Sequence, residues 1–224
     1  MKPTFKKLYL LIFVVLIAFT TLLILQIQKT IEMDTKNSER PLIEDVSLDI
    51  PVTPNDPVFG NQGATITIIE FIDLNNKENL VIHQKIKNFV AEHPTEIRLI
   101  WKDDPKQSFF SADKNKIHRA GICVFAQNKT TFWSFVDEVA TNKKINDTKL
   151  SEMLNRYVSD QTASANCFTN PDTEKKITDN LTFIKSIGLP DAPLIFINNK
   201  LVNYIDEINI TDLLEQIITP LPGN

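Results

Sequence analysis

The chain has 224 residues, with 24 lysines and arginines against 28 acidic residues, and a net charge of −4 at pH 7. Because nucleic-acid-binding proteins usually carry a basic excess, this balance argues against a nucleic-acid partner. Glycine is scarce, with only 5 residues, so a glycine-rich phosphate-binding loop is not expected. The three histidines and two cysteines have no metal-like spacing, and we expect neither a metal nor any other cofactor.

The N-terminal region predicts a membrane anchor. Residues 1–7 carry three lysines, and residues 8–27 form a run of twenty residues without a charge. As an α-helix this run would be ~30 Å long, which matches the hydrocarbon core of a bilayer. The lysines before it predict a cytoplasmic tail and a single-pass topology with the rest of the chain outside the cytoplasm. A cleaved signal peptide is the alternative, but the apolar run is long and no Ala-x-Ala-like site follows it.

Residues 28–55 are polar and rich in proline, and they have little periodicity, which is typical of a linker. Within them, Ile43, Val46, Leu48 and Ile50 are compatible with a short edge strand. The folded domain is expected over residues 56–220.

The folded domain begins with a strand–helix–strand pattern. The β-branched run over residues 65–71 predicts a buried strand, and residues 77–92 place apolar side chains on one face of a helix. Residues 96–102 alternate and predict a second strand. Such a unit normally closes right-handed with its strands parallel.

The second half predicts a helical insertion over about residues 107–187 and then a hairpin. The expected helices cover residues 113–128, 131–140, 147–158 and 172–187, with Asp147 and Asp172 as N-caps and Gly188 at the last C-terminus. Asn198 and Asn199 suit a hairpin turn with positive φ between residues 194–197 and 200–204, and residues 211–218 predict a closing helix. The order β-α-β, helical insertion, β-β-α is that of an α/β thioredoxin-like fold.

Four segments carry a family resemblance: residues 56–73, residues 101–105, residues 120–133, and residues 187–200 with Ala192 and Pro193. In order and spacing they resemble the entry strand, the second strand, the helical subdomain and the proline loop of the DsbA-like thioredoxin-fold family. That family comprises bacterial extracytoplasmic thiol-disulfide oxidoreductases. The resemblance covers about residues 56–218.

The chain departs from the family at the active site. In the family a Cys-x-x-Cys motif begins three positions after the residue that matches Asp73, and here its cysteines are replaced by Asn76 and Asn79. Disulfide exchange needs a thiolate, which an amide cannot supply, so we assign no catalytic residue. We expect Asn76 or Asn75 to cap the following helix, with an amide-based binding contact as the alternative.

Cys123 and Cys167 match positions at which some relatives carry an additional cysteine pair. Outside the cytoplasm two such cysteines usually pair, so we expect a structural disulfide. Two free buried thiols, or a redox-active pair, are the alternatives.

The resemblance implies that Pro193 is a cis-proline that faces the degenerate active-site loop. The backbone of Ala192 would then offer hydrogen bonds to an extended peptide, although the proline could be purely architectural. Glu70 and Asp73 are interpreted as acids inherited from the family, and His83 as a half-exposed helix residue. Phe132 and Trp133 are expected in the core.

These observations favour a non-catalytic protein that acts as a peptide-binding, protein-binding or scaffold module. Its expected partners are extended or unfolded segments, or another envelope protein. The expected contact residues are Asn76, Lys77, Glu78, Asn79, Ala192 and Pro193. The alternative function is a thiol-disulfide oxidoreductase in disulfide formation or isomerisation, which would use Cys123 and Cys167 or a partner in trans.

Overall fold

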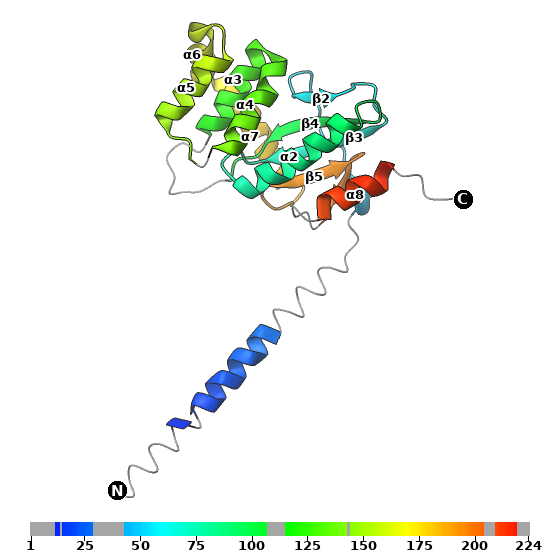
Figure 1. Ribbon diagram of the computed structural model, residues 1–224, viewed down its shortest axis with the longest axis vertical. Helices are drawn as coiled ribbons and strands as arrows, with labels where there is room; N and C mark the ends of the chain where they lie inside the picture. The colour runs from blue at the N-terminus through cyan, green and yellow to red at the C-terminus, as the bar shows by residue number, and fades with distance from the viewer. Residues whose placement is uncertain are drawn as a thin grey trace, which may run out of the picture. The chain divides into compact units, whose positions relative to one another are not determined.

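The computed structural model describes residues 12–13, 15–28, 43–106, 115–142, 144–203 and 209–218. The chain divides into two compact units, Met1–Pro41 and Leu42–Asn224. In the first unit, residues 15–28 form an α-helix with exposed side chains (Figure 1). No helix within the described residues is both long enough and apolar enough to cross a membrane. Residues 8–11 and 14 of the predicted anchor lie outside the described residues.

The second unit is built on a mixed sheet of six strands in the order β1-β6-β5-β3-β4-β2. Its strands are β1 (Ile43–Ser47), β2 (Val58–Gly60), β3 (Ile66–Ile72), β4 (Ile97–Asp103), β5 (Leu194–Ile197) and β6 (Lys200–Val202). β3 and β4 are parallel and are joined by α2 (Lys77–Glu92), which confirms the predicted strand–helix–strand unit. β1 is the predicted edge strand, whereas β2 was not expected as a separate strand.

The remaining described helices are α3 (Lys116–Gln127), α4 (Lys129–Thr141), α5 (Asp147–Tyr157), α6 (Gln161–Thr169), α7 (Pro171–Ser186) and α8 (Asn209–Ile218). α3 to α6 gather at one end of the sheet and, together with α7, form the predicted helical insertion (Figure 1). Its first residues, 107–114, lie outside the described residues, as does Tyr204 at the end of the predicted hairpin. The sequence pattern did not predict α6, because its few apolar residues form no continuous stripe.

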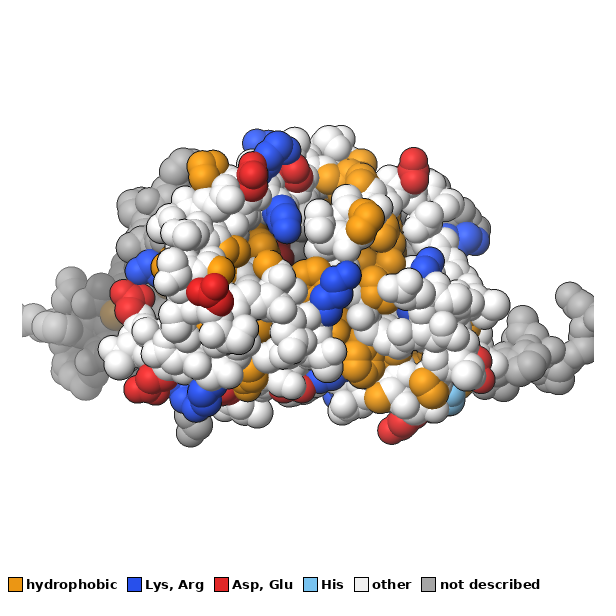
Figure 2. Space-filling model, turned by 90° about the horizontal axis from the view of Figure 1, so that it is seen from above, with side chains coloured by type: hydrophobic (Ala, Val, Ile, Leu, Met, Phe, Trp, Pro, Cys, Tyr) orange, Lys and Arg blue, Asp and Glu red, His pale blue; other side chains and the backbone are white. Residues whose placement is uncertain are grey.

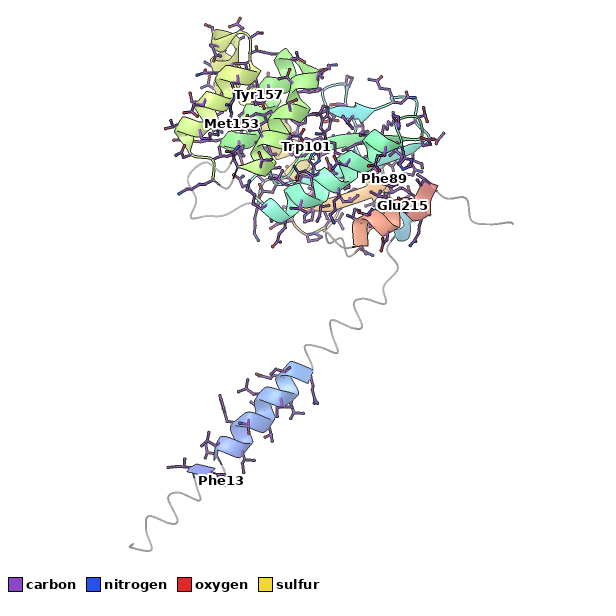
Figure 3. All side chains as sticks on the ribbon, in the orientation of Figure 1. Phe13, Phe89, Trp101, Met153, Tyr157 and Glu215 are labelled. Carbon is purple, nitrogen blue, oxygen red and sulfur yellow. A yellow bond between two sulfur atoms is a disulfide. The ribbon has the colours of Figure 1, made fainter. Side chains whose placement is uncertain are left out.

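The central strands are buried on both faces. Alternate side chains of a strand point to opposite faces, so Ile68 and Ile72 of β3 pack with α2 and α8 while Ile69 and Phe71 pack with Ile184 of α7. Trp101 lies where α2 and the helical insertion meet (Figure 3). From above, hydrophobic side chains gather in a band with Lys and Arg side chains among them (Figure 2).

Two predicted helix caps are wrong by one or two residues. The N-cap of α5 is Asn146, whose side chain accepts the N–H of Lys149, and the N-cap of α7 is Asn170. Asp147 and Asp172 instead lie in the first turns of these helices, where a carboxylate interacts favourably with the helix dipole. An asparagine was available just before each aspartate, and asparagine caps as well as aspartate.

The turn residues behave as predicted. Asn198 and Asn199 have φ of 49° and 67° and form the turn between β5 and β6. Gly188, with φ of 70°, follows α7 and allows the left-handed conformation that ends the helix.

Cys123 of α3 and Cys167 of α6 form a disulfide with an Sγ–Sγ distance of 1.98 Å. The bond closes a loop with a sequence separation of 44 residues, which corresponds to at most ~4 kcal/mol of loop-closure entropy. It therefore ties α6, a short helix with one buried residue, to α3.

Candidate functional site

The candidate site lies at one edge of the sheet, where β3 ends and β5 begins. Phe71 of β3 is paired with Leu194 of β5. Pro193 precedes Leu194 and Asp73 follows β3, so the proline loop and the residues leading into α2 meet at this edge. The Ala192–Pro193 peptide bond is cis. The structure thus brings together two segments that are more than a hundred residues apart in the sequence.

Asn76 is the N-cap of α2. Its Oδ1 accepts hydrogen bonds from the N–H groups of Glu78, at 2.9 Å, and Asn79, at 3.3 Å. The capping prediction is therefore confirmed. Two of the amides that the first turn of a helix leaves without an internal partner are satisfied by this one side chain.

Asn79 lies in the first turn of α2 and is only 1% exposed. Its Oδ1 accepts the N–H of Asp73 at 3.1 Å, which ties the helix to the end of β3. Asn79 is therefore a buried structural residue, whereas Lys77 and Glu78 are exposed. Lys77 also donates from Nζ to the carbonyl of Val139 in α4, at 2.7 Å.

A buried imidazole lies behind this loop. His118 of α3 places Nδ1 2.8 Å from Asp103 Oδ1 and Nε2 3.1 Å from Asp73 Oδ1. Burial alone would lower the pKa of His118, but the hydrogen bonds and charges of the two carboxylates outweigh it and raise the pKa to about 9. Burial alone would likewise raise the pKa of Asp73, but its hydrogen bonds, first that with His118, lower it to about 2.

The backbone N–H of Leu74 also lies 3.1 Å from His118 Nε2. That nitrogen can accept a hydrogen bond only when the ring is neutral, because the imidazolium has a proton on both nitrogens. In the charged ring Nε2 therefore donates its hydrogen bond to Asp73. If Nε2 lost its proton, it could instead accept a hydrogen bond from the N–H of Leu74.

The proline loop is held by Asp104. The N–H of Ala192 donates to Asp104 Oδ2 at 2.9 Å, and the N–H of Asp104 donates to the carbonyl of Ile72 at 3.1 Å. Burial raises the pKa of Asp104 to about 6 despite this bond, and the charges of Asp191 and Asp73 add to the rise. The amide beside Pro193, which the resemblance implied would be open to a peptide, is thus already engaged.

The sequence interpretation of His83 is wrong. His83 is fully buried, with Nδ1 2.6 Å from Glu70 Oε1, and its ring packs between Trp101 and Trp133. Burial raises the pKa of Glu70, against the opposing effect of His83. The helical period contained the missed signal, because residue 83 lies on the same face of α2 as the apolar residues Leu80 and Ile86.

The chemistry open to this site is limited. The site holds no thiol, Glu70 is engaged with His83, and Asp73 and Asp103 are engaged with His118. Within the described ranges, no group of three His, Cys, Asp or Glu side chains could hold a metal ion. What the site presents to solvent is the start of α2 beside the partly exposed Pro193.

Known protein structures share this fold. A thioredoxin-like oxidoreductase from Silicibacter pomeroyi aligns at a TM-score of 0.61, with 18% identity over 74% of this chain and 93% of its own. Pseudomonas aeruginosa DsbA2 aligns at a TM-score of 0.59, with 22% identity over 77% of this chain and 100% of its own. A periplasmic thioredoxin-like protein from Salmonella enterica serovar Typhimurium aligns at a TM-score of 0.61, with 15% identity over 74% of this chain and 89% of its own. No family model and no curated protein matches the chain.

These likenesses show that the chain has the DsbA-like thioredoxin fold, which confirms the predicted α/β fold with a helical insertion. At such identities they establish the fold alone, since one fold supports many functions.

Replacing the N-cap should destabilise the protein. We expect Asn76→Ala to lower the free energy of unfolding by about 1 kcal/mol, because the N–H groups of Glu78 and Asn79 lose their acceptor. Urea unfolding followed by tryptophan fluorescence measures this loss. Asn88→Ala, the same change at an exposed interior position of α2, should cost nothing, and an equal loss in both variants would contradict the capping role.

The His118 network should make stability depend on pH. Folding raises the pKa of His118. The contribution of His118 to the free energy of unfolding is therefore complete below about pH 6.5 and is lost as the pH rises through about 9. The free energy of unfolding, measured with urea, should therefore fall by up to a few kcal/mol between pH 6 and about pH 9.5. His118→Gln should be less stable and should lack this fall, whereas His93→Gln should retain it. A flat profile in the unaltered protein would contradict an imidazolium at this position.

Proposed function

We propose that this protein is a membrane-anchored, extracytoplasmic binding module that has lost disulfide-exchange activity. One observation carries the proposal. The two amides that replace the thiols of the related active site, those of Asn76 and Asn79, are fixed in structural hydrogen bonds. The loop is thus stabilised as part of the fold without a group that can attack a sulfur atom.

The chain's own disulfide is a poor substitute for the missing motif. Exchange requires a thiolate to reach one of the two sulfur atoms along the S–S axis. Cys123 is 0% exposed, and Cys167 of α6 is half-buried. Because access is restricted at both ends, we interpret the bond as structural rather than as a redox centre.

The membrane and location parts of the proposal rest on the sequence. The twenty uncharged residues at positions 8–27 follow a basic N-terminus, which is the pattern of an anchor whose following domain lies outside the cytoplasm. A disulfide within the domain fits an oxidising compartment, and one protein of similar fold is described as periplasmic.

The binding surface that we propose is the exposed start of α2 together with Pro193. Lys77 and Glu78 are exposed there, and Ala192 and Pro193 are partly exposed at the edge of β5. The partner would be an extended or unfolded segment, or another envelope protein. Because the Ala192 N–H is donated to Asp104, a peptide strand must either displace that carboxylate or bind through other groups of the loop.

A thiol-disulfide assay tests the loss of activity. The full chain in detergent micelles should not accelerate insulin reduction by dithiothreitol. The double variant Asn76→Cys with Asn79→Cys should accelerate it, because a thiol at the N-terminus of α2 has its pKa lowered below ~8.5. Asn88→Cys with Glu92→Cys, at the other end of α2, controls for added thiols. Activity of the unaltered chain that disappears in Cys123→Ser would overturn the proposal in favour of an enzyme.

Site-specific crosslinking tests the binding role. A photoreactive amino acid in place of Glu78 should crosslink to reduced, carboxymethylated α-lactalbumin, a permanently unfolded protein. The same group in place of Asn166, which is exposed on α6, should crosslink far less. Equal crosslinking at both positions, or none at either, would contradict a binding surface at α2.

Any truncated version should begin before Ile43, because β1 pairs with β6 and belongs to the sheet.

A further inference from the structure

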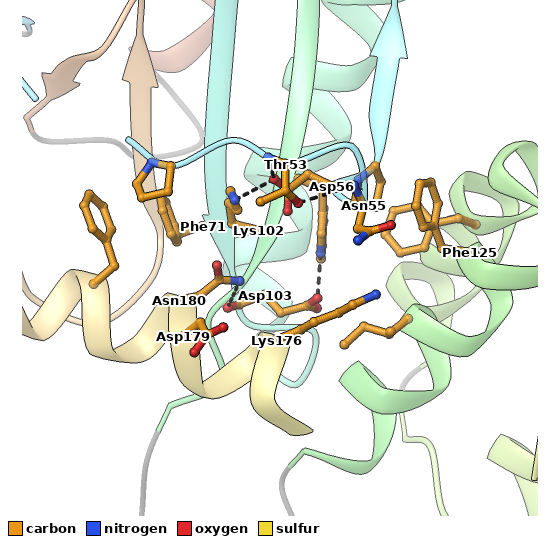
Figure 4. Close-up of a pocket in the computed structure, with 16 residues that line it drawn as sticks. Thr53, Asn55, Asp56, Phe71, Lys102, Asp103, Phe125, Lys176, Asp179 and Asn180 are labelled. Carbon is orange, nitrogen blue, oxygen red and sulfur yellow. Dashed lines mark hydrogen bonds and ion pairs between the residues drawn. The ribbon is translucent and has the colours of Figure 1, made fainter. Parts of the chain in front are cut away.

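A cavity of about 340 Å³ is lined in part by Asp103, whose carboxylate also binds His118. β2 covers the edge of β4 only as far as Ile100, and beyond it the N–H of Trp101 donates to the carbonyl of Pro57. The cavity occupies this edge, enclosed by the segment 51–57, the helices α3 and α4, and α7 (Figure 4). Its volume falls in the range of small-molecule sites.

Aromatic side chains form one part of the cavity wall, beside polar and charged residues. Trp101 and Phe132 are 1% exposed, Phe125 is 9% exposed, and the rings of Phe132 and Trp101 pack edge-on at 5.6 Å. Phe71 and Phe183 line the side toward α7. Rigid rings that are packed against one another form a preformed slot, which suits a planar apolar ligand.

Among the charged residues that line the cavity, one lysine differs from the rest in its pairing. Each lining carboxylate has another partner: Asp56 binds Lys102 at 2.7 Å, Asp103 binds His118 at 2.8 Å, and Asp179 binds Lys175 at 2.7 Å. Lys176, on α7, has no ion pair or hydrogen bond to any described residue. It is half-buried, and its side chain extends along the lower side of the cavity toward α3 (Figure 4).

We propose that this cavity binds a small organic anion with a planar apolar body, whose carboxylate pairs with Lys176 while its ring lies against Phe125, Phe132 and Trp101. A half-buried lysine without a counter-charge can pair with an anion that enters the cavity. The aromatic wall supplies the remaining affinity by burying the apolar body of the ligand. This site is independent of the proposed peptide surface.

The test uses indole-3-acetate as the probe and indole-3-acetamide as its uncharged isostere. The full chain in detergent micelles is titrated, and the two tryptophan indole N–H signals are followed by ¹⁵N NMR. We expect indole-3-acetate to bind with a Kd near ~1 mM or below and to shift the Trp101 signal, because Trp101 lines the cavity. The acetamide should bind about tenfold more weakly, because it lacks the charge that pairs with Lys176.

Matched variants on α7 decide the role of the lysine. Lys176→Gln should reduce indole-3-acetate affinity to that of the acetamide, whereas Lys185→Gln, an exposed lysine outside the cavity, should change nothing. Three results would overturn the proposal: no shift of the Trp101 signal at millimolar probe, equal affinity for acid and amide, or equal loss in both variants. None of these results depends on whether the α2 surface binds peptides.

Discussion

The ion-paired imidazole of His118 is the interaction on which the geometry of the candidate site depends. Its ring comes from the helical insertion, while its two carboxylate partners, Asp73 and Asp103, follow or end the parallel central strands. It therefore joins the insertion to the sheet at the point where the loop into α2 begins. Removing the imidazolium or the carboxylates would leave a buried charge uncompensated. The free-energy cost of such a charge is far larger than the net stabilisation by the intact pair.

From this network the hydrogen bonds continue outward to the surface. Asp73 Oδ2 accepts the N–H of Lys106, and its N–H is donated to Asn79. Asp104 links the carbonyl of Ile72 to the amide of Ala192. The loop before α2 and the proline loop are thus positioned by acids that have other fixed partners. Such a surface is preorganised, so the protein would lose little conformational entropy when a ligand binds.

The two asparagines at the start of α2 have structural roles. A helix N-terminus that lowers the pKa of a thiol is also a place where an amide oxygen can satisfy backbone N–H groups. Asn76 makes use of the same exposed amides of α2, and Asn79 adds a contact to the end of β3. The start of α2 is therefore held by the cap at Asn76, and the end of β3 is held by the hydrogen bond that the N–H of Asp73 donates to Asn79.

Much of the fold could be predicted because its signals are local. The alternation and β-branching of the strands, the helical period of α2 and the two asparagines with positive φ are properties of neighbouring residues. The caps at Asn146 and Asn170 were misassigned because aspartate and asparagine are near-equivalent caps, and only the observed backbone dihedrals distinguish the N-cap from the first turn.

By itself the sequence determined the absence of a thiol from the loop before α2, the βαβ unit and the position of the hairpin, since these follow from residue identity and short-range periodicity. The tertiary structure alone decided that His83 is buried against Glu70, that His118 bridges two strand ends, and that Asp104 holds the amide beside Pro193. Each of these contacts joins residues 13 to 88 positions apart. No local pattern encodes such pairs, because the free energy of a buried polar group depends on which partner the folded chain places beside it.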